Sequence, residues 1–158
     1  MKPILRIVLC SVLPLPMALF SPVSAQEIIK IDTAHRCLYT GANELESLYR
    51  FDASPEVEQM VREILEKTGQ TQNFKLIHTN VPSIAAIRDG SKRYLLYNYE
   101  FFYPLVSRKN ISYGILAHSI GHLLEKDFSG NTPQRQREES IADVFMGRAL
   151  QALGLPLE

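Results

Sequence analysis

Cysteine is nearly absent from this sequence, which holds only Cys10 and Cys37 among its 158 residues. Cys10 lies in an N-terminal segment that has the pattern of a cleaved export signal, so the mature chain keeps a single thiol. One cysteine cannot form a disulfide within a chain, and stability must therefore come from packing or from a bound metal. A buried thiol is the simplest interpretation of Cys37, and pairing with a second molecule is the alternative.

Long apolar runs are also scarce. The longest covers residues 7–20, contains Pro14 and Pro16, and is shorter than the ~20 residues that a membrane-spanning helix needs. Two basic residues precede this run, and the small-residue triplet 23–25 follows it. This pattern is typical of a secretory signal peptide that is cleaved before Gln26. We therefore expect residues 1–25 to be a signal peptide and the protein to be periplasmic or secreted, with no membrane span after cleavage.

Neither sign of charge is in excess. The chain has 17 basic and 17 acidic residues; residues 1–25 hold two of the basic ones and none of the acidic ones, so residues 26–158 carry a formal charge of −2. This balance gives no indication of nucleic-acid binding. The 133 residues of the mature chain show no internal repeat and no low-complexity tract. Their number suits a single domain, residues 26–158, with its own core.

Local patterns predict a helix followed by strands in the first half of this domain. The helix begins at Pro55, with Ser54 as its N-cap, and ends at Gly69. The runs NFKLIHT, SIAAIRD and KRYLLYN are rich in β-branched and aromatic residues, and residues 89–91 form a turn between the last two. We expect these runs to form a small antiparallel sheet.

Two further helices are predicted in the second half. One is capped by Asn110 and runs through ISYGILAHSIGHLLEKD, and the other opens at residues 132–133 and ends at about Leu153, before Gly154. The order of one helix, several strands and two helices indicates an α+β fold.

These two helices each carry a pair of side chains suited to a metal ion. His118 and His122 stand four residues apart on the first, and Glu139 and Asp143 stand four residues apart on the second. Residues at this spacing share one helix face. Two histidines and one carboxylate are a common ligand set for catalytic zinc, which keeps a further position open. Asp143 is placed to accept the outer N–H of a ligand histidine and so to set its tautomer.

A simpler interpretation exists for each pair. Histidines in an apolar helix are usually packed and hydrogen-bonded, and Glu139 and Asp143 alone would form an exposed acidic face paired with Arg135 or Arg137. A structural domain with a metal-free polar network therefore stays open as an alternative. The helix YGILAHSIGHLL must be largely buried, however, and two histidines within it need partners. A metal with nearby carboxylates would supply them.

The segment from about residue 73 to residue 154 resembles the gluzincin metallopeptidases, especially the group with the HtpX-like and prenyl-protein proteases. Their pattern is H-E-x-x-H followed by E-x-x-x-D on a later helix, and small exported bacterial proteins share it. The corresponding stretches here are RYLLYNYEFF, GILAHSIGH and EESIADVFMGRAL. The metzincin pattern does not match, because Glu125 and Phe128 stand where it has glycine and a third histidine.

This resemblance implies a zincin-like fold, in which the sheet packs on an active-site helix and on a following ligand-bearing helix. It also implies zinc ligation by His118, His122 and Glu139, with support from Asp143. Ser119 is the departure, because it replaces the family's catalytic glutamate, the general base. A serine is a poor base, and Glu138 and Glu125 are the possible substitutes.

Two functions follow for a zinc site that lacks its base. The first is a pseudopeptidase, which keeps zinc and holds a peptide or protein segment in the former cleft. The second is an active zinc endopeptidase that uses a base other than residue 119; we favour the first. Peptides often bind to such folds as an added strand at a sheet edge, and SIAAIRD is the candidate edge, with an ordinary covering hairpin as the alternative.

Overall fold

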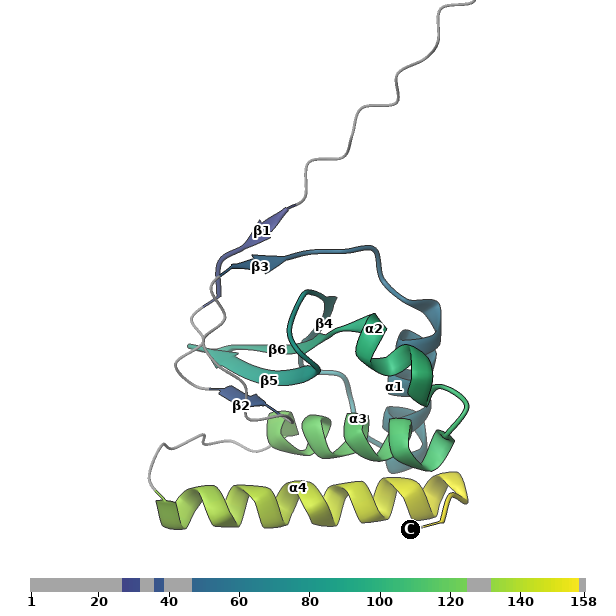
Figure 1. The fold of residues 1–158 in the computed structure, drawn as a ribbon. Coiled ribbons are helices and arrows are strands. Elements are labelled where there is room, and N and C mark those ends of the chain that lie inside the picture. The colour runs from purple at the N-terminus through teal and green to yellow at the C-terminus, as the bar shows by residue number, and fades with distance from the viewer. Residues whose placement is uncertain (1–26, 32–35, 39–46, 125–131, 157–158) are drawn as a thin grey trace, which may run out of the picture.

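The computed structural model describes residues 27–31, 36–38, 47–124 and 132–156, and these form a mixture of helices and short strands (Figure 1). The expected α+β class is confirmed. The predicted signal peptide and Glu125 lie outside the described residues. In chain order, the elements are β1 (Ile28–Ile29), β2 (Arg36–Leu38), β3 (Leu48–Tyr49), α1 (Pro55–Thr68), β4 (Lys75–His78), β5 (Ile84–Asp89), β6 (Lys92–Tyr97), α2 (Tyr99–Phe102), the 3₁₀ helix η1 (Tyr103–Leu105), α3 (Lys109–Leu124) and α4 (Thr132–Leu153).

Helix α1 begins and ends where the sequence predicts. The Ser54 hydroxyl accepts a hydrogen bond from the N–H of Val57, and Pro55 occupies the first helical position, where no N–H is needed. Gly69 ends the helix in the left-handed region with φ of 67°, a conformation that glycine adopts at little steric cost. The apolar residues between them, with Val57, Val61 and Ile64 among them, are buried.

The main sheet differs from the predicted one in two respects. Its strand order is β2-β5-β6-β4, and β4 pairs parallel to β6 rather than antiparallel. The prediction of a wholly antiparallel sheet is therefore wrong. So is the prediction that SIAAIRD lies at an edge, because β5 pairs with β6 on one side and with β2 on the other. A separate pair of strands is formed by β1 and β3.

Alternating side chains of the central strands fill two apolar clusters, one on each face of the sheet. Ile84 and Ala86 of β5 join the larger cluster with α1, α3 and α4, while Ala85 and Ile87 join the smaller cluster with Leu48. This alternation is the period-2 pattern of a strand that is buried on both faces. Figure 1 shows the resulting layers, with α3 between the sheet and α4.

Helix α3 is central and is buried around most of its circumference. It begins at Lys109, so Asn110 lies inside the first turn rather than at the cap, and the described part ends at Leu124. Its buried residues occupy nearly every position from Ser112 to Leu123. The short helices α2 and η1, which lead into it, were not predicted. No helix in the described part of the chain combines the length and the apolar character that a membrane crossing requires.

Helix α3 is also tied to α1 by a hydrogen bond, in which the Tyr113 hydroxyl donates to the Glu63 carboxylate. This bond lowers the pKa of Glu63 below its ordinary value. Burial, together with the bond to Glu63, raises the pKa of Tyr113, so the hydroxyl keeps its proton. The stabilisation is present above the ordinary pKa of Glu63 and is lost as the pH falls through its lower, folded-state pKa.

We expect Tyr113→Phe to lower the free energy of unfolding by about 1 kcal/mol at about pH 7, after a discount for the partial exposure of Glu63. The difference from the parent protein should shrink toward about pH 3, because the carboxylate that accepts the bond is then protonated. Urea unfolding at both pH values measures it. Tyr103→Phe, at a tyrosine that is 70% exposed, is the matched control and should change neither value. An equal loss at both pH values would contradict the assignment.

Candidate metal centre

Helices α3 and α4 cross closely because small residues meet at the crossing point. A Cβ atom built on Gly121 would lie 2.7 Å from Cα and 3.2 Å from Cβ of Ala142. The shorter of these distances is one that real Cβ atoms do not tolerate. Gly121 adjoins His122 in the chain, and Ala142 adjoins Asp143. The close approach therefore brings together the helix turns that carry the predicted metal-binding side chains.

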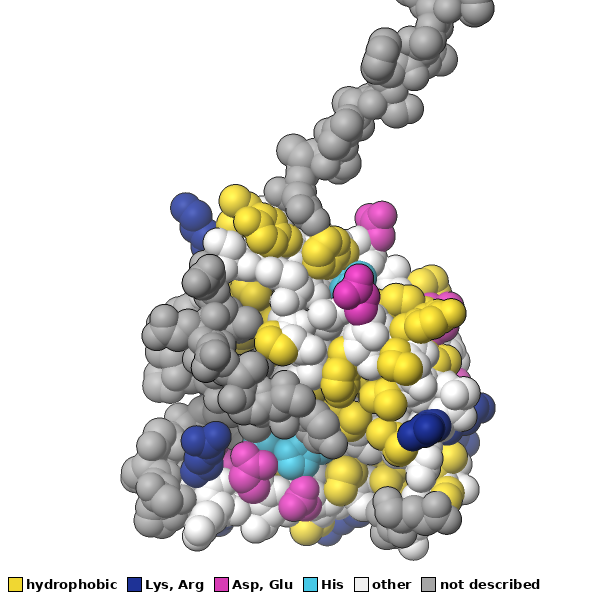
Figure 2. Space-filling model, viewed as in Figure 1, with side chains coloured by type: hydrophobic (Ala, Val, Ile, Leu, Met, Phe, Trp, Pro, Cys, Tyr) yellow, Lys and Arg dark blue, Asp and Glu magenta, His cyan; other side chains and the backbone are white. Residues whose placement is uncertain are grey.

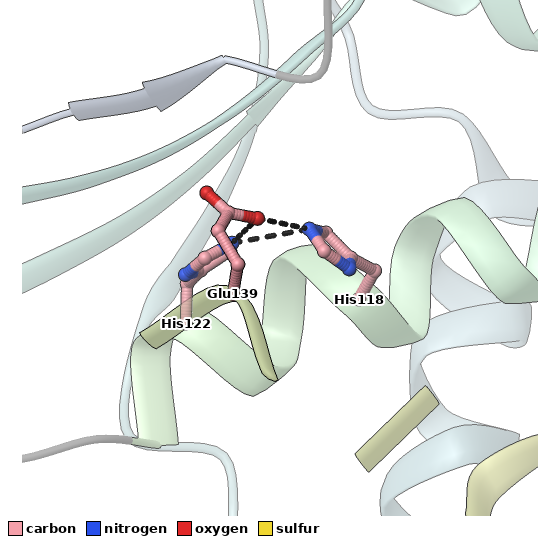
Figure 3. Close-up of side chains that lie close together, drawn as sticks. All are labelled: His118, His122 and Glu139. Carbon is pink, nitrogen blue, oxygen red and sulfur yellow. Dashed lines mark hydrogen bonds and ion pairs between the residues drawn. The ribbon is translucent and has the colours of Figure 1, made fainter. Parts of the chain in front are cut away.

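Three of these side chains converge on one point (Figure 3). Nε2 of His118 lies 3.1 Å from Nε2 of His122 and 3.3 Å from Oε2 of Glu139. The third side of this triangle, from Nε2 of His122 to the same Glu139 oxygen, measures 3.4 Å. Among the described residues, His118, His122 and Glu139 form the group of ligand atoms that could hold a metal ion. The structure therefore brings together the three residues that the sequence predicts as ligands.

Asp143, the fourth predicted residue, sets the orientation of His118. Its Oδ1 atom lies 2.9 Å from Nδ1 of His118. An ionised carboxylate can only accept, so a neutral His118 carries its proton on Nδ1 and donates it to Asp143. Its Nε2 then presents a lone pair toward Glu139 and His122, which is the tautomer that a metal ligand needs.

The centre is buried on one side and open on the other. The exposed fraction of the side chains rises from 2% for His122 and 16% for His118 to 39% for Glu139 and 62% for Asp143. Burial lowers the pKa of His122, although the negative charge of Glu139 opposes this shift, and the neutral form is the one that binds metal. Figure 2 shows a histidine surface between acidic side chains on the face of the molecule above α4.

The residues fit a divalent metal ion by distance and by donor chemistry. Zinc bonds of 2.0–2.1 Å in tetrahedral geometry separate neighbouring ligand atoms by about 3.3 Å, close to the three observed separations. In the tautomer set by Asp143, lone pairs of His118 Nε2 and of the Glu139 carboxylate face each other across 3.3 Å. A cation within the triangle, or an N–H on His122 Nε2, which lies 3.1 Å from His118 Nε2 and 3.4 Å from the Glu139 oxygen, offsets the repulsion between these lone pairs.

Family models, curated proteins and solved structures give no match to this chain.

Ser119 takes no part in the triangle. Its hydroxyl donates to the carbonyl oxygen of Ile115, 3.0 Å away in the preceding turn, and the residue is only 4% exposed. Glu138 is buried as well, at 8% exposure, and lies close enough to His122 for its negative charge to raise the pKa of that histidine.

Gly121 and Ala142 were not predicted as part of the site. The signal for Gly121 was present, because a glycine inside an otherwise apolar helix often marks a close approach of another backbone. Ala142 gave no such signal, since alanine is common on any helix. The role of β2 beside β5 was also missed, because its three residues show no strand period.

We expect Gly121→Ala to separate α3 from α4 and to widen the ligand triangle, which should weaken metal binding by at least about tenfold and lower stability by about 1–3 kcal/mol. Zinc titration by calorimetry and urea unfolding measure the two effects. Gly114→Ala on the same helix is the matched control: its Cβ would meet only side-chain atoms of Leu150 and Met146, at 3.7 Å. The control should bind zinc like the parent protein and gain up to about 1 kcal/mol from the better helix propensity of alanine. Equal zinc affinity in Gly121→Ala and the parent would refute the role of this contact.

Proposed function

We propose that this protein is an exported, zinc-binding, metallopeptidase-like protein that has lost most of its catalytic capacity and holds a peptide or protein segment at its metal centre. The observation that carries the proposal is the triangle of His118 Nε2, His122 Nε2 and Glu139 Oε2. All three of its sides are between 3.1 and 3.4 Å. The Asp143 contact to His118 adds support, because it resembles the carboxylate–histidine pairs that orient zinc ligands.

The open side of the centre supports a role beyond structural stabilisation. Structural zinc sites are usually closed by four protein ligands, whereas catalytic and substrate-binding sites keep a position for water or substrate. Among the described residues, three supply the donors, and the side chains of Glu139 and Asp143 are 39% and 62% exposed. A peptide carbonyl could therefore approach from solvent without a rearrangement of α3 or α4.

Loss of the general base argues for binding rather than rapid hydrolysis. A bound zinc ion would supply polarisation of a carbonyl and activation of water. Proton transfer by a positioned carboxylate is typically worth about 10²- to 10⁴-fold in rate, and no carboxylate occupies position 119. The Ser119 hydroxyl is held by the Ile115 carbonyl and has little basicity. The ligands and Asp143 would bind and orient a peptide, while position 119 supplies no efficient proton acceptor.

An active endopeptidase is the second candidate, and one observation favours it. Glu138 is buried and its negative charge acts on His122, so it is a candidate to substitute for the missing base. The two candidates differ in whether the unaltered protein cleaves an unfolded substrate such as casein, and in whether Glu138→Gln abolishes that cleavage.

The ligand assignment predicts graded losses of zinc. We expect His118→Ala, His122→Ala and Glu139→Ala to bind zinc too weakly to detect by calorimetry of the metal-free protein, and Asp143→Asn to weaken binding by about 10- to 100-fold. In the parent protein, added zinc should raise the thermal midpoint, and it should not do so in the three ligand variants. Glu66→Ala, at an exposed carboxylate of α1, is the control and should bind like the parent. Unchanged binding in all four site variants would remove the basis of the proposal.

Restoration of the base should restore hydrolysis. We expect Ser119→Glu to cleave casein in the presence of zinc at least about 10²-fold faster than the parent protein and Ser119→Ala. Because position 119 is 4% exposed, the carboxylate should also lower stability by a few kcal/mol in the absence of zinc. Cleavage by the parent protein as fast as by Ser119→Glu would instead support the endopeptidase.

A further inference from the structure

The strand β2 lies along the edge of β5 that the sheet would otherwise expose. It pairs antiparallel with β5, with Arg36 opposite Ile87, Cys37 opposite Ala86 and Leu38 opposite Ala85. These partners are three of the six residues of β5. Very short edge strands are weakly held, since each residue of pairing adds little free energy and three residues add few bonds.

The register shows which main-chain groups of β5 point toward β2. Asp89 and Lys92 close the two-residue turn to β6, and the N–H of Asn98 donates to the carbonyl of Ser83. Odd-numbered residues of β5 therefore bond with β6, because hydrogen-bonded and non-bonded pairs alternate along an antiparallel pair. The N–H and C=O groups of the even-numbered residues, Ala86 among them, point toward β2. Of the three residues of β2, Cys37 is thus the one whose N–H joins the ladder.

This edge belongs to the strand that supports the metal-bearing helix. Helix α3, which carries His118 and His122, packs directly against β5 and β6. In Figure 1, β2 lies near the C-terminal end of α3, and both histidines belong to the last seven residues of that helix. An extended chain that paired with β5 would therefore run beside the metal centre. Main-chain pairing of this kind holds peptides of many sequences.

We propose that β2 is an internal occupant of the peptide-binding edge, and that an extended peptide displaces residues 36–38 from β5 when it binds. This inference rests on the proposed function, because the displacing peptide is the segment held at the metal centre. A peptide that pairs with all six residues of β5 makes more main-chain bonds than the three-residue strand that it replaces. Occupation of the edge by β2 thereby lowers the apparent affinity of the protein for the peptide, because only the molecules with a free edge bind.

Proline substitution in β2 tests the displacement. Cys37→Pro removes the N–H that bonds to Ala86, so it should empty the edge without a change in the site. Fluorescence anisotropy of fluorescein-labelled casein, added to the full chain loaded with zinc, should show at least about tenfold tighter binding to this variant than to the parent. Cys37→Ala retains the N–H, and Arg36→Pro places proline where the N–H points away from β5. Both controls should bind casein like the parent protein.

Hydrogen exchange of the unaltered protein gives a second test that does not depend on the folding of a variant. Saturating casein should speed exchange at the Cys37 amide and leave the Ala86 amide protected, because the new strand takes over that bond. Casein that binds equally to the parent and to folded Cys37→Pro, or that leaves the Cys37 amide protected, would overturn the displacement and leave the proposed function intact. If the purified parent protein binds no zinc and casein still displaces β2, the proposed metal centre is refuted and the displacement stands.

Discussion

The contact between Gly121 and Ala142 is the constraint on which the candidate metal centre depends. A hydrogen atom in place of a side chain at Gly121 lets the backbones of α3 and α4 approach within the distance that a Cβ atom would need. Glutamate and aspartate reach only a few ångströms from their helix, so a wider crossing would leave Glu139 and Asp143 short of the histidines. One missing methyl group thereby permits four polar side chains from two helices to meet.

Burial of α3 affects the protonation of the histidines at this site. His122 is almost completely buried, and burial disfavours its charged form, so the imidazole is kept neutral and available as a ligand. Asp143 directs the free lone pair of His118 toward Glu139 and His122, where a cation would find three donor atoms together. Ser119 lies on the same helix, but its hydroxyl donates a hydrogen bond to the carbonyl oxygen of Ile115. The described part of α3 therefore supplies two imidazole donors and no carboxylate.

Local sequence patterns predicted the helices, and the convergence of four polar side chains from two of them, better than they predicted the sheet. Caps such as Ser54 and Gly69, and pairs four residues apart such as His118 and His122, are determined within a few residues of the chain. The parallel pairing of β4 with β6 and the pairing of β2 with β5 join distant segments, and no local period encodes such neighbours. The prediction that β5 lies at an edge failed for this reason, because β2 covers that side.

The central claim is that His118, His122 and Glu139 hold one zinc ion with an open position. X-ray absorption at the zinc edge, on protein purified without a histidine tag, tests it most directly. The account predicts about one zinc per chain, with two imidazole nitrogens and oxygen ligands at about 2.0–2.2 Å and no sulfur. Protein that contains no metal, or zinc that is bound through sulfur, would contradict it.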